Sequence, residues 1–153
     1  MREVLLLGVI LNHPFLLETY VEVLADITVT DRNLDKLKHA LVDAASSEKT
    51  LDRQGLRDHL TRKELGAICE RVASTSLLKA AGWAKPASPA SSVSSGWLHV
   101  LELHRRATQL EAEHRMAAAA YRSDNSDENF ARMRALEDEL KSINKATISD
   151  DAA

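Results

Sequence analysis

The chain has 153 residues, of which 44% are hydrophobic, 28% charged and only 4% aromatic. That length fits one domain, or a small domain with an appendage, and the composition is ordinary for a folded soluble protein. The formal net charge of −3 gives no global sign of a protein that binds nucleic acid or an acidic membrane.

The single cysteine, Cys69, excludes an internal disulfide and indicates a reducing compartment. The apolar run of residues 4–11 is too short to cross a bilayer. It is also unlike a signal peptide, because Glu3 follows Arg2 directly and no small-residue cleavage site comes after the run. We therefore expect a cytoplasmic protein without a membrane partner.

Five glycines, three prolines and few alternating β-branched runs leave little support for strands, so the sequence predicts an all-α fold. A bundle of about six short helices is expected over residues 1–84. Their expected extents are residues 2 to 11, 14 to before 28, 31 to before 46, 51 to 60, 61 to 72 and 75 to 83. Thr61 and Glu64 fit a capping box that would open the fifth of these helices.

Residues 85–95 differ sharply from the rest of the chain, with two prolines and five serines in eleven residues. Such a composition favours a mobile connector. The sequence therefore predicts a helical bundle over residues 1–84, this connector, a hairpin over 96–146 and a tail over 147–153.

The hairpin is expected from two apolar stripes. From Trp97 to about Arg122 there is no glycine or proline, and apolar or small residues recur at alternating spacings of three and four, which predicts one helix face. After a polar break at residues 123–126, a second stripe follows at Phe130, Met133, Leu136, Leu140 and Ile143. Helices joined by so short a turn pack antiparallel, and we expect the first four residues of the second stripe to hold the hairpin together. A long hairpin of this kind usually offers one face to a partner.

No sequence motif for phosphate binding, a serine nucleophile or zinc occurs, so no catalytic residue, metal site or cofactor is predicted. Glu111 and His114 form one ExxH pair, but a di-iron bundle needs two, and we interpret His114 as a residue of the hairpin seam. Cys69 falls on an apolar helix face beside Ile68 and Val72 and is interpreted as a buried thiol.

A helix-turn-helix that reads DNA is a rival interpretation of residues 51–72, because two helices of suitable size meet there at a tight junction. Residues 50–72 carry five basic and four acidic side chains, a net charge of only +1. Since phosphate contacts need surplus positive charge, two ordinary bundle helices are the favoured interpretation.

The two ends of the chain resemble a known family. Residues 2–7, with the sequence REVLLL, and residues 11–18, LNHPFLLE, resemble the start of the C-terminal domain of bacterial DNA primase. The stretch 103–120, rich in Glu, Arg and Ala, together with SDE at 126–128 and LEDEL at 136–140, resembles the terminal hairpin of that domain. The resemblance covers nearly the whole chain in architecture but only its ends in recognisable residues.

This resemblance implies a non-catalytic domain that binds the replicative DNA helicase hexamer and modulates it during primer synthesis at the replication fork. Primer synthesis itself would reside in separate domains of the parent primase. We expect docking through the hairpin, no direct binding of nucleic acid, and a monomer or a dimer with exchanged hairpins. The expected contact residues are Tyr121, Arg134, Glu137, Lys141 and Ile143.

The N-terminal collar domain of the replicative helicase is the alternative, because it resembles this bundle with a hairpin. Its first helix also commonly carries a Leu-Gly step like Leu7-Gly8. The turn of residues 12–14, with the sequence NHP, favours the primase domain. A helical DNA-binding regulator is the next alternative.

Overall fold

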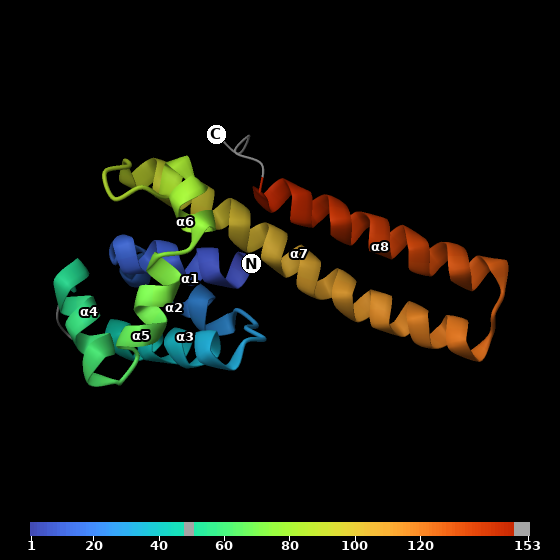
Figure 1. The fold of residues 1–153 in the computed structure, drawn as a ribbon, viewed down its shortest axis with the longest axis horizontal. Helices are drawn as coiled ribbons and strands as arrows, with labels where there is room; N and C mark the ends of the chain where they lie inside the picture. Colours follow the sequence, from blue (N-terminus) through green and yellow to red (C-terminus); the bar gives the residue numbers. More distant parts are fainter. Residues whose placement is uncertain (48–50, 149–153) are drawn as a thin grey trace. The chain divides into compact units, whose positions relative to one another are not determined.

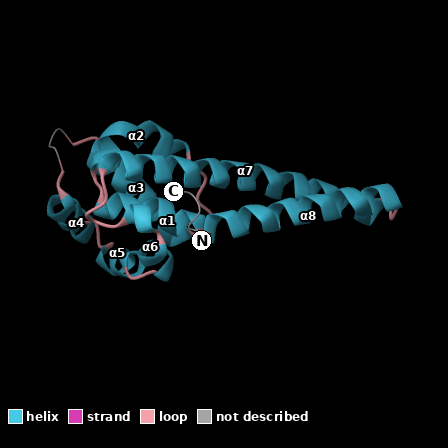
Figure 2. Ribbon diagram, turned by 90° about the horizontal axis from the view of Figure 1, so that it is seen from above, coloured by secondary structure: helices cyan, strands magenta, loops and turns pink. Residues whose placement is uncertain are grey.

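The structure is a computed structural model that describes residues 1–47 and 51–148, and all regular structure in these residues is helical (Figure 1, Figure 2). The chain divides between Val100 and Leu101 into two compact units. The first unit contains α1 (Arg2–Asn12), α2 (Phe15–Asp26), α3 (Arg32–Ala45), α4 (Arg53–Arg62), α5 (Gly66–Ala73), α6 (Ser76–Ala80), the 3-10 turn η1 (Gly82–Ala84) and the start of α7 (Ala90–Ser123). The rest of α7 and α8 (Asp127–Ile148) form the second unit.

The predicted all-α fold with a terminal hairpin is confirmed. The first unit includes the start of α7 and is therefore longer than the predicted bundle of residues 1–84. The predicted tail of residues 147–153 begins inside α8, and its last five residues lie outside the described part of the chain.

α1 is the buried helix of the first unit. Every residue from Leu5 to Leu11 is buried, and α1 packs against α2, α3, α4, α5 and α6. A helix that is apolar on all sides is stable only where other helices cover all sides, so α1 determines the arrangement around it. A Cβ at Gly8 would lie 3.1 Å from Val72 of α5 and 3.3 Å from Leu78 of α6. The missing side chain at Gly8 thus allows these two helices to approach α1 closely.

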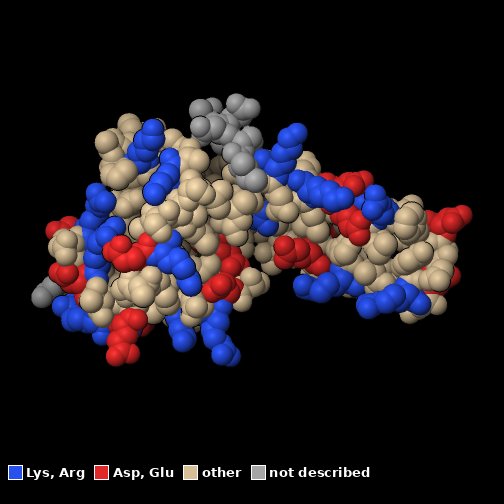
Figure 3. All heavy atoms as spheres, viewed as in Figure 1, with Lys and Arg blue, Asp and Glu red and all other residues tan. Residues whose placement is uncertain are grey.

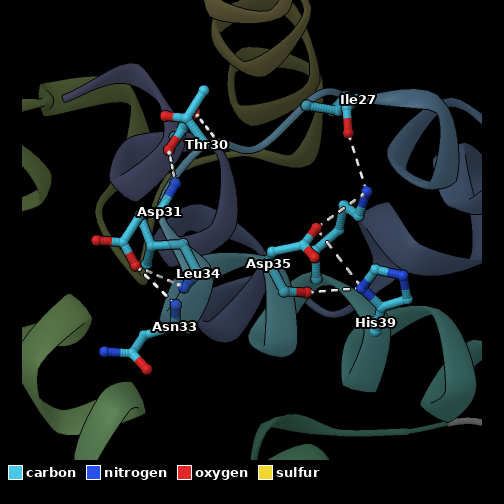
Figure 4. Close-up of polar contacts among 9 residues, drawn as sticks. Ile27, Thr30, Asp31, Asn33, Leu34, Asp35 and His39 are labelled. Carbon is cyan, nitrogen blue, oxygen red and sulfur yellow. Dashed lines mark hydrogen bonds and ion pairs between the residues drawn. The ribbon is translucent and has the colours of Figure 1, made fainter.

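Two carboxylates organise the start of α3. Glu3 of α1 accepts hydrogen bonds from the backbone N–H and the hydroxyl of Thr30, at 2.8 and 3.0 Å. Asp31, the N-cap of α3, accepts hydrogen bonds from the backbone N–H groups of Asn33 at 2.8 Å and Leu34 at 3.0 Å (Figure 4). Because the N–H of Leu34 stabilises the ionised carboxylate, the pKa of Asp31 is lowered from its ordinary value.

The predicted capping box at Thr61 and Glu64 was wrong. Thr61 lies in the last turn of α4, where its hydroxyl donates to the carbonyl oxygen of Arg57 at 2.9 Å. Glu64 follows α4 with a φ of 62° and donates its N–H to the carbonyl oxygen of Thr61 at 3.0 Å. The N–H of Leu65 reaches back to the carbonyl oxygen of Leu60, also at 3.0 Å. These two bonds form a Schellman motif, so the pattern that resembled a helix start marks a helix end.

The predicted connector of residues 85–95 was wrong for its second half, because α7 already begins within it. The carbonyl oxygen of Pro89, just before the helix, accepts the N–H of Val93 at 3.1 Å. A proline costs little at this place, because the first N–H groups of a helix have no partner within it. Val93, Trp97 and Val100 follow at helical spacing and are all buried. Their packing offsets the weaker helix preference of the serines between them.

Trp97 anchors the first part of α7 in the core of the first unit. Its side chain is fully buried, and the indole N–H donates to the carbonyl oxygen of Leu6 in α1 at 3.0 Å. The ring stacks on Tyr20 with a centroid distance of 5.2 Å and an interplanar angle of 24°. Tyr20 departs from helical geometry, with φ −124° and ψ 21°, and marks a kink in α2. The neighbouring Gly96 lies so close to Trp83 that a Cβ there would overlap the indole ring.

The second unit is an antiparallel pair of helices, which lie side by side in both views (Figure 1, Figure 2). Its buried core consists of Ala107, Leu110 and Ile143, with Leu103, Leu136 and Leu140 packed against them. Asn129 closes the turn between the helices, because its side-chain amide donates to the carbonyl oxygen of Asp124 at 2.9 Å. The backbone N–H of Asn129 also donates to the hydroxyl of Ser126 at 3.2 Å. The hairpin is thus held by an apolar seam and a turn closed by hydrogen bonds.

Candidate protein-binding surface

Two aromatic rings meet near the turn of the hairpin. Tyr121 of α7 and Phe130 of α8 have ring centroids 5.6 Å apart at an interplanar angle of 51°. Phe130 is 47% exposed, although it was expected to hold the two helices together. The ring therefore has one side on Tyr121 and leaves a substantial apolar surface open to solvent.

Glu137 lies in a polar network that joins the two helices. One of its carboxylate oxygens accepts from Nε2 of His114 at 3.2 Å, and the other accepts from the guanidinium of Arg134, also at 3.2 Å. The side chains of His114 and Glu137 are 28% and 31% exposed. His114 is thus a seam residue, as predicted. Glu137 is engaged within the hairpin, and only part of its carboxylate is open to a partner.

Ile143 is a core residue of the hairpin. It is only 8% exposed and packs in the same cluster as Ala107 and Leu110 of α7. The expectation that Ile143 contacts a partner directly therefore does not hold for this arrangement of the hairpin. A stripe of apolar residues indicates a buried helix face. Ile143 belongs to the same stripe as Leu136 and Leu140, which also pack on this core.

The two edges of the seam can be told apart by their ion pairs. Glu137 and His114 meet at one edge, whereas Arg106 of α7 donates to Glu139 of α8 at 2.6 Å at the other. The hydrogen bond with Glu139 raises the pKa of Arg106 above its ordinary value. On the Arg106 side of α7, Gln109 also donates to a carboxylate, that of Glu113 at 2.8 Å. These polar side chains are engaged within the hairpin itself.

Four exposed basic residues share the Glu137 edge of the hairpin. With 3.6 residues per turn, Arg134 and Lys141 project from the same side of α8 as Glu137. The same geometry places Arg115 and Arg122 on the corresponding side of α7, away from Arg106. With Phe130 they form a surface that we call the basic flank. It consists of Arg115, Arg122, Phe130, Arg134 and Lys141, and the same geometry places the carboxylates of Glu111, Asp127 and Asp138 on this side as well.

Arg115 and Arg122 were not among the residues predicted as contacts. The signal for them in the sequence is their spacing of seven, which is two helical turns and equals the spacing of Arg134 and Lys141. That signal becomes readable only when the pairing of α7 with α8 is known. Figure 3 shows basic and acidic side chains spread along the hairpin, with uncharged surface between them towards the turn.

A shallow hollow of about 310 Å³ lies in the first unit, between α3 and the turn after α4. It is lined by Asp35, Lys36, His39, Ala40, Asp43, Lys63 and Leu65. Nδ1 of His39 donates to the carbonyl oxygen of Asp35 at 2.8 Å (Figure 4). Charges of both signs alternate along its wall, so the hollow indicates no particular ligand. Among residues 1–47 and 51–148, no three His, Cys, Asp or Glu side chains are grouped to hold a metal ion.

Cys69 lies in α5, and the rival interpretation as a helix-turn-helix concerns α4 and α5. The Cys69 side chain is buried, as predicted, and burial raises the pKa of its thiol. The guanidinium of Arg57 on α4 lies 3.8 Å from the carboxylate of Glu70 on α5, which neutralises part of the positive charge of this segment. A reactive thiolate and a surface for phosphate are thus both disfavoured here.

Comparison with protein-family models, with curated proteins and with solved structures found no match to this chain. The resemblance to the primase domain therefore rests on the residues quoted above and on the helical architecture. In the part of the chain that the structure describes, no helix combines the length and the apolar character needed to cross a membrane.

Proposed function

We propose that the chain is a non-catalytic domain that docks a bacterial DNA primase on the replicative DNA helicase and modulates the helicase during primer synthesis. The observation that carries the proposal is the basic flank of the hairpin. There an exposed phenylalanine lies beside arginines and a lysine on two long, tightly paired helices. The resemblance of residues 2–7 and 11–18 to the primase domain supplies the identity of the partner.

The hairpin has the size and chemistry of an interface. At 1.5 Å per residue, the 22 residues of α8 extend for about 33 Å, which is long enough for one side of a standard protein interface. Aromatic residues and arginine are enriched in such interfaces, and they often contribute most of the binding energy. Because the two helices are fixed by their own core, binding would cost little ordering of the backbone.

A calorimetric titration tests the proposal. The intact chain should bind the replicative helicase hexamer of the same organism, and a chain that ends at Ser123 and lacks α8 should not. Replacing Arg134, Glu137 and Lys141 together by alanine should weaken binding while circular dichroism shows unchanged helicity. Failure of the intact chain to bind the helicase would refute the proposed function.

The helicase collar domain is the second candidate, and Gly8 favours it. The Leu7-Gly8 step is typical of the first helix of that domain, and here Gly8 lies where a side chain would crowd Val72. A collar domain takes part in ring assembly, whereas the primase domain is expected to be mainly monomeric or to exchange hairpins in pairs. The mass of the isolated chain in solution over a range of concentrations separates the two, because a ring-sized assembly would favour the collar.

A further inference from the structure

We infer that Asn125, in the turn between α7 and α8, is a site of spontaneous deamidation, a reaction that the chain carries out on itself with water as the only co-reactant. The inference goes beyond the proposed function and does not depend on it. The structure describes all five asparagines of the chain, and Asn125 alone lies outside a helix. It is also followed by a small residue, Ser126.

The reaction is an attack of the main chain on the neighbouring side chain. The backbone nitrogen of Ser126 bonds to the amide carbon Cγ of Asn125, the Cγ–Nδ2 bond breaks, and the proton of the backbone nitrogen leaves with the amide as ammonia. Water then opens the five-membered imide, giving its hydroxyl to a carbonyl carbon and its proton to the nitrogen. Opening at Cγ yields aspartate, and opening at the main-chain carbonyl yields isoaspartate. No electrons are transferred in either step.

The turn leaves both reacting groups free. Residues 124–126 are not helical, and Asn125 is exposed. Within the described residues, the side chain of Asn125 has no hydrogen-bond partner, and the N–H of Ser126 donates to none. The attack requires the nitrogen and Cγ to come within about 3–3.5 Å of each other. Neither group must first break a hydrogen bond to reach that geometry.

The hydrogen bonds that close the turn bypass Asn125. The side-chain amide of Asn129 donates to the carbonyl oxygen of Asp124 at 2.9 Å. The hydroxyl of Ser126 accepts the N–H of Asn129 at 3.2 Å, and its carbonyl oxygen accepts the N–H of Phe130 at 3.0 Å. Ser126 therefore takes part in the turn through its oxygen atoms, which leaves its nitrogen available for the attack.

The helices protect the other asparagines. Asn12 is followed by His13, whose N–H donates to the carbonyl oxygen of Val9 at 2.9 Å. Asn33 is followed by Leu34, whose N–H donates at 3.0 Å to the carboxylate that caps α3. The two asparagines of α8 lie inside the helix, where each following N–H belongs to the helical hydrogen-bond ladder. At these four positions the attacking nitrogen is engaged and the backbone torsions are fixed.

Deamidation alters the end of the hairpin that carries the pair of Tyr121 and Phe130. Either product adds one negative charge beside Asp124 and close in sequence to Asp127, and like charges at short range are unfavourable. Isoaspartate also adds one carbon to the main chain, inside the turn that Asn129 closes. The modification therefore changes both the charge and the backbone at one end of the candidate protein-binding surface.

Peptide mapping by mass spectrometry tests the inference. The intact chain is incubated at physiological pH and temperature for several weeks, and conversion of each asparagine is followed. We expect Asn125 to be converted at least about tenfold faster than any other asparagine. An endoproteinase that cleaves before aspartate but not before isoaspartate separates the two products.

Two variants separate the effect of the fold from that of the local sequence. Lys145→Ser places the same Asn-Ser pair inside α8, where Asn144 should stay at least about tenfold slower than Asn125 in the folded chain. In urea the two sites should react at similar rates. Ser126→Thr keeps the hydroxyl that accepts the N–H of Asn129 but adds a branch next to the attacking nitrogen, and it should slow conversion of Asn125. Circular dichroism checks that both variants fold.

Three results would overturn the inference. The first is conversion of Asn125 no faster than that of Asn12 or Asn33, which need no variant for the comparison. The second is equal rates, in the folded chain, at Asn125 and at the Asn-Ser pair that Lys145→Ser creates, because the turn would then contribute nothing. The third is a rate at Asn125 that rises about tenfold or more in urea, because the turn would then protect the residue. None of these results depends on whether the chain binds a helicase.

Discussion

Replacing Glu64 by glycine should stabilise the first unit. Glu64 has a φ of 62° at the end of α4, in the left-handed region that is unfavourable for a residue with a Cβ. That conformation costs a non-glycine residue about 1–2 kcal/mol. Glycine removes this cost, but its greater freedom in the unfolded chain takes back about 0.5–1 kcal/mol. The net gain in the free energy of unfolding should be about 0.5–1 kcal/mol, which corresponds to a rise in Tm of about 1–4 °C.

The assay is urea unfolding of three variants followed by circular dichroism. Glu64→Ala keeps the Cβ and should leave the free energy of unfolding nearly unchanged. Lys63→Gly, at the adjacent position with a φ of −87°, should destabilise, because no strain is relieved there. The reasoning would be refuted if Glu64→Gly and Lys63→Gly changed stability in the same direction.

Three further predictions concern the first unit. Gly96→Ala should destabilise by about 1–3 kcal/mol in urea unfolding, because the added methyl group overlaps the ring of Trp83, and Trp83→Leu in the same chain should restore part of the loss. The pKa of Asp31 is lowered by its bond from Leu34, so its contribution to stability should be present above the ordinary carboxyl pKa of about 3.9 and be lost as the pH falls through the lower folded-state value. Acid unfolding of Asp31→Asn should lack this component, and an unchanged acid transition would contradict it. Because burial raises the pKa of Cys69, its thiol should react with a thiol reagent at least about tenfold more slowly in the folded protein than in urea, and equal rates would show an accessible thiol.

The parts of the fold that depend on long patterns were predictable from the sequence. α1 lies where the continuous apolar run from Val4 to Leu11 predicted it, because a run of that length must be covered on all sides. The hairpin follows from two stripes of helical spacing on either side of a short polar turn. In both cases many residues point to the same answer, and no single one decides it.

The errors came from short patterns whose meaning depends on tertiary structure. Thr61 and Glu64 have the spacing of a helix start. The same residues nevertheless end α4, because Glu64 adopts a left-handed backbone conformation that this spacing does not predict. The serines after Pro89 suggested a connector by composition. The segment is helical instead, because the burial of Val93 and Trp97, which are both fully buried, stabilises the helix despite its serines.

The side chains that the hairpin exposes were predictable only in part for a related reason. A stripe on one helix says which side is apolar, but not how the second helix is rotated against it. The expected contacts therefore included Ile143, which is buried in the seam. The side of α7 on which Arg115 and Arg122 lie relative to α8 follows only from the pairing of Glu137 with His114.

Because Trp97 is buried against Leu6 and Tyr20, its fluorescence reports the unfolding of the first unit and not that of the hairpin. Both tryptophans, Trp83 and Trp97, belong to the first unit, whereas the hairpin contains a tyrosine, Tyr121, and no tryptophan. Intrinsic tryptophan emission therefore follows the melting of the bundle, while the ellipticity of the long helices also follows that of the hairpin. Coincident melting curves from the two signals would mean that bundle and hairpin unfold as one cooperative system, and separated curves would give each a stability of its own.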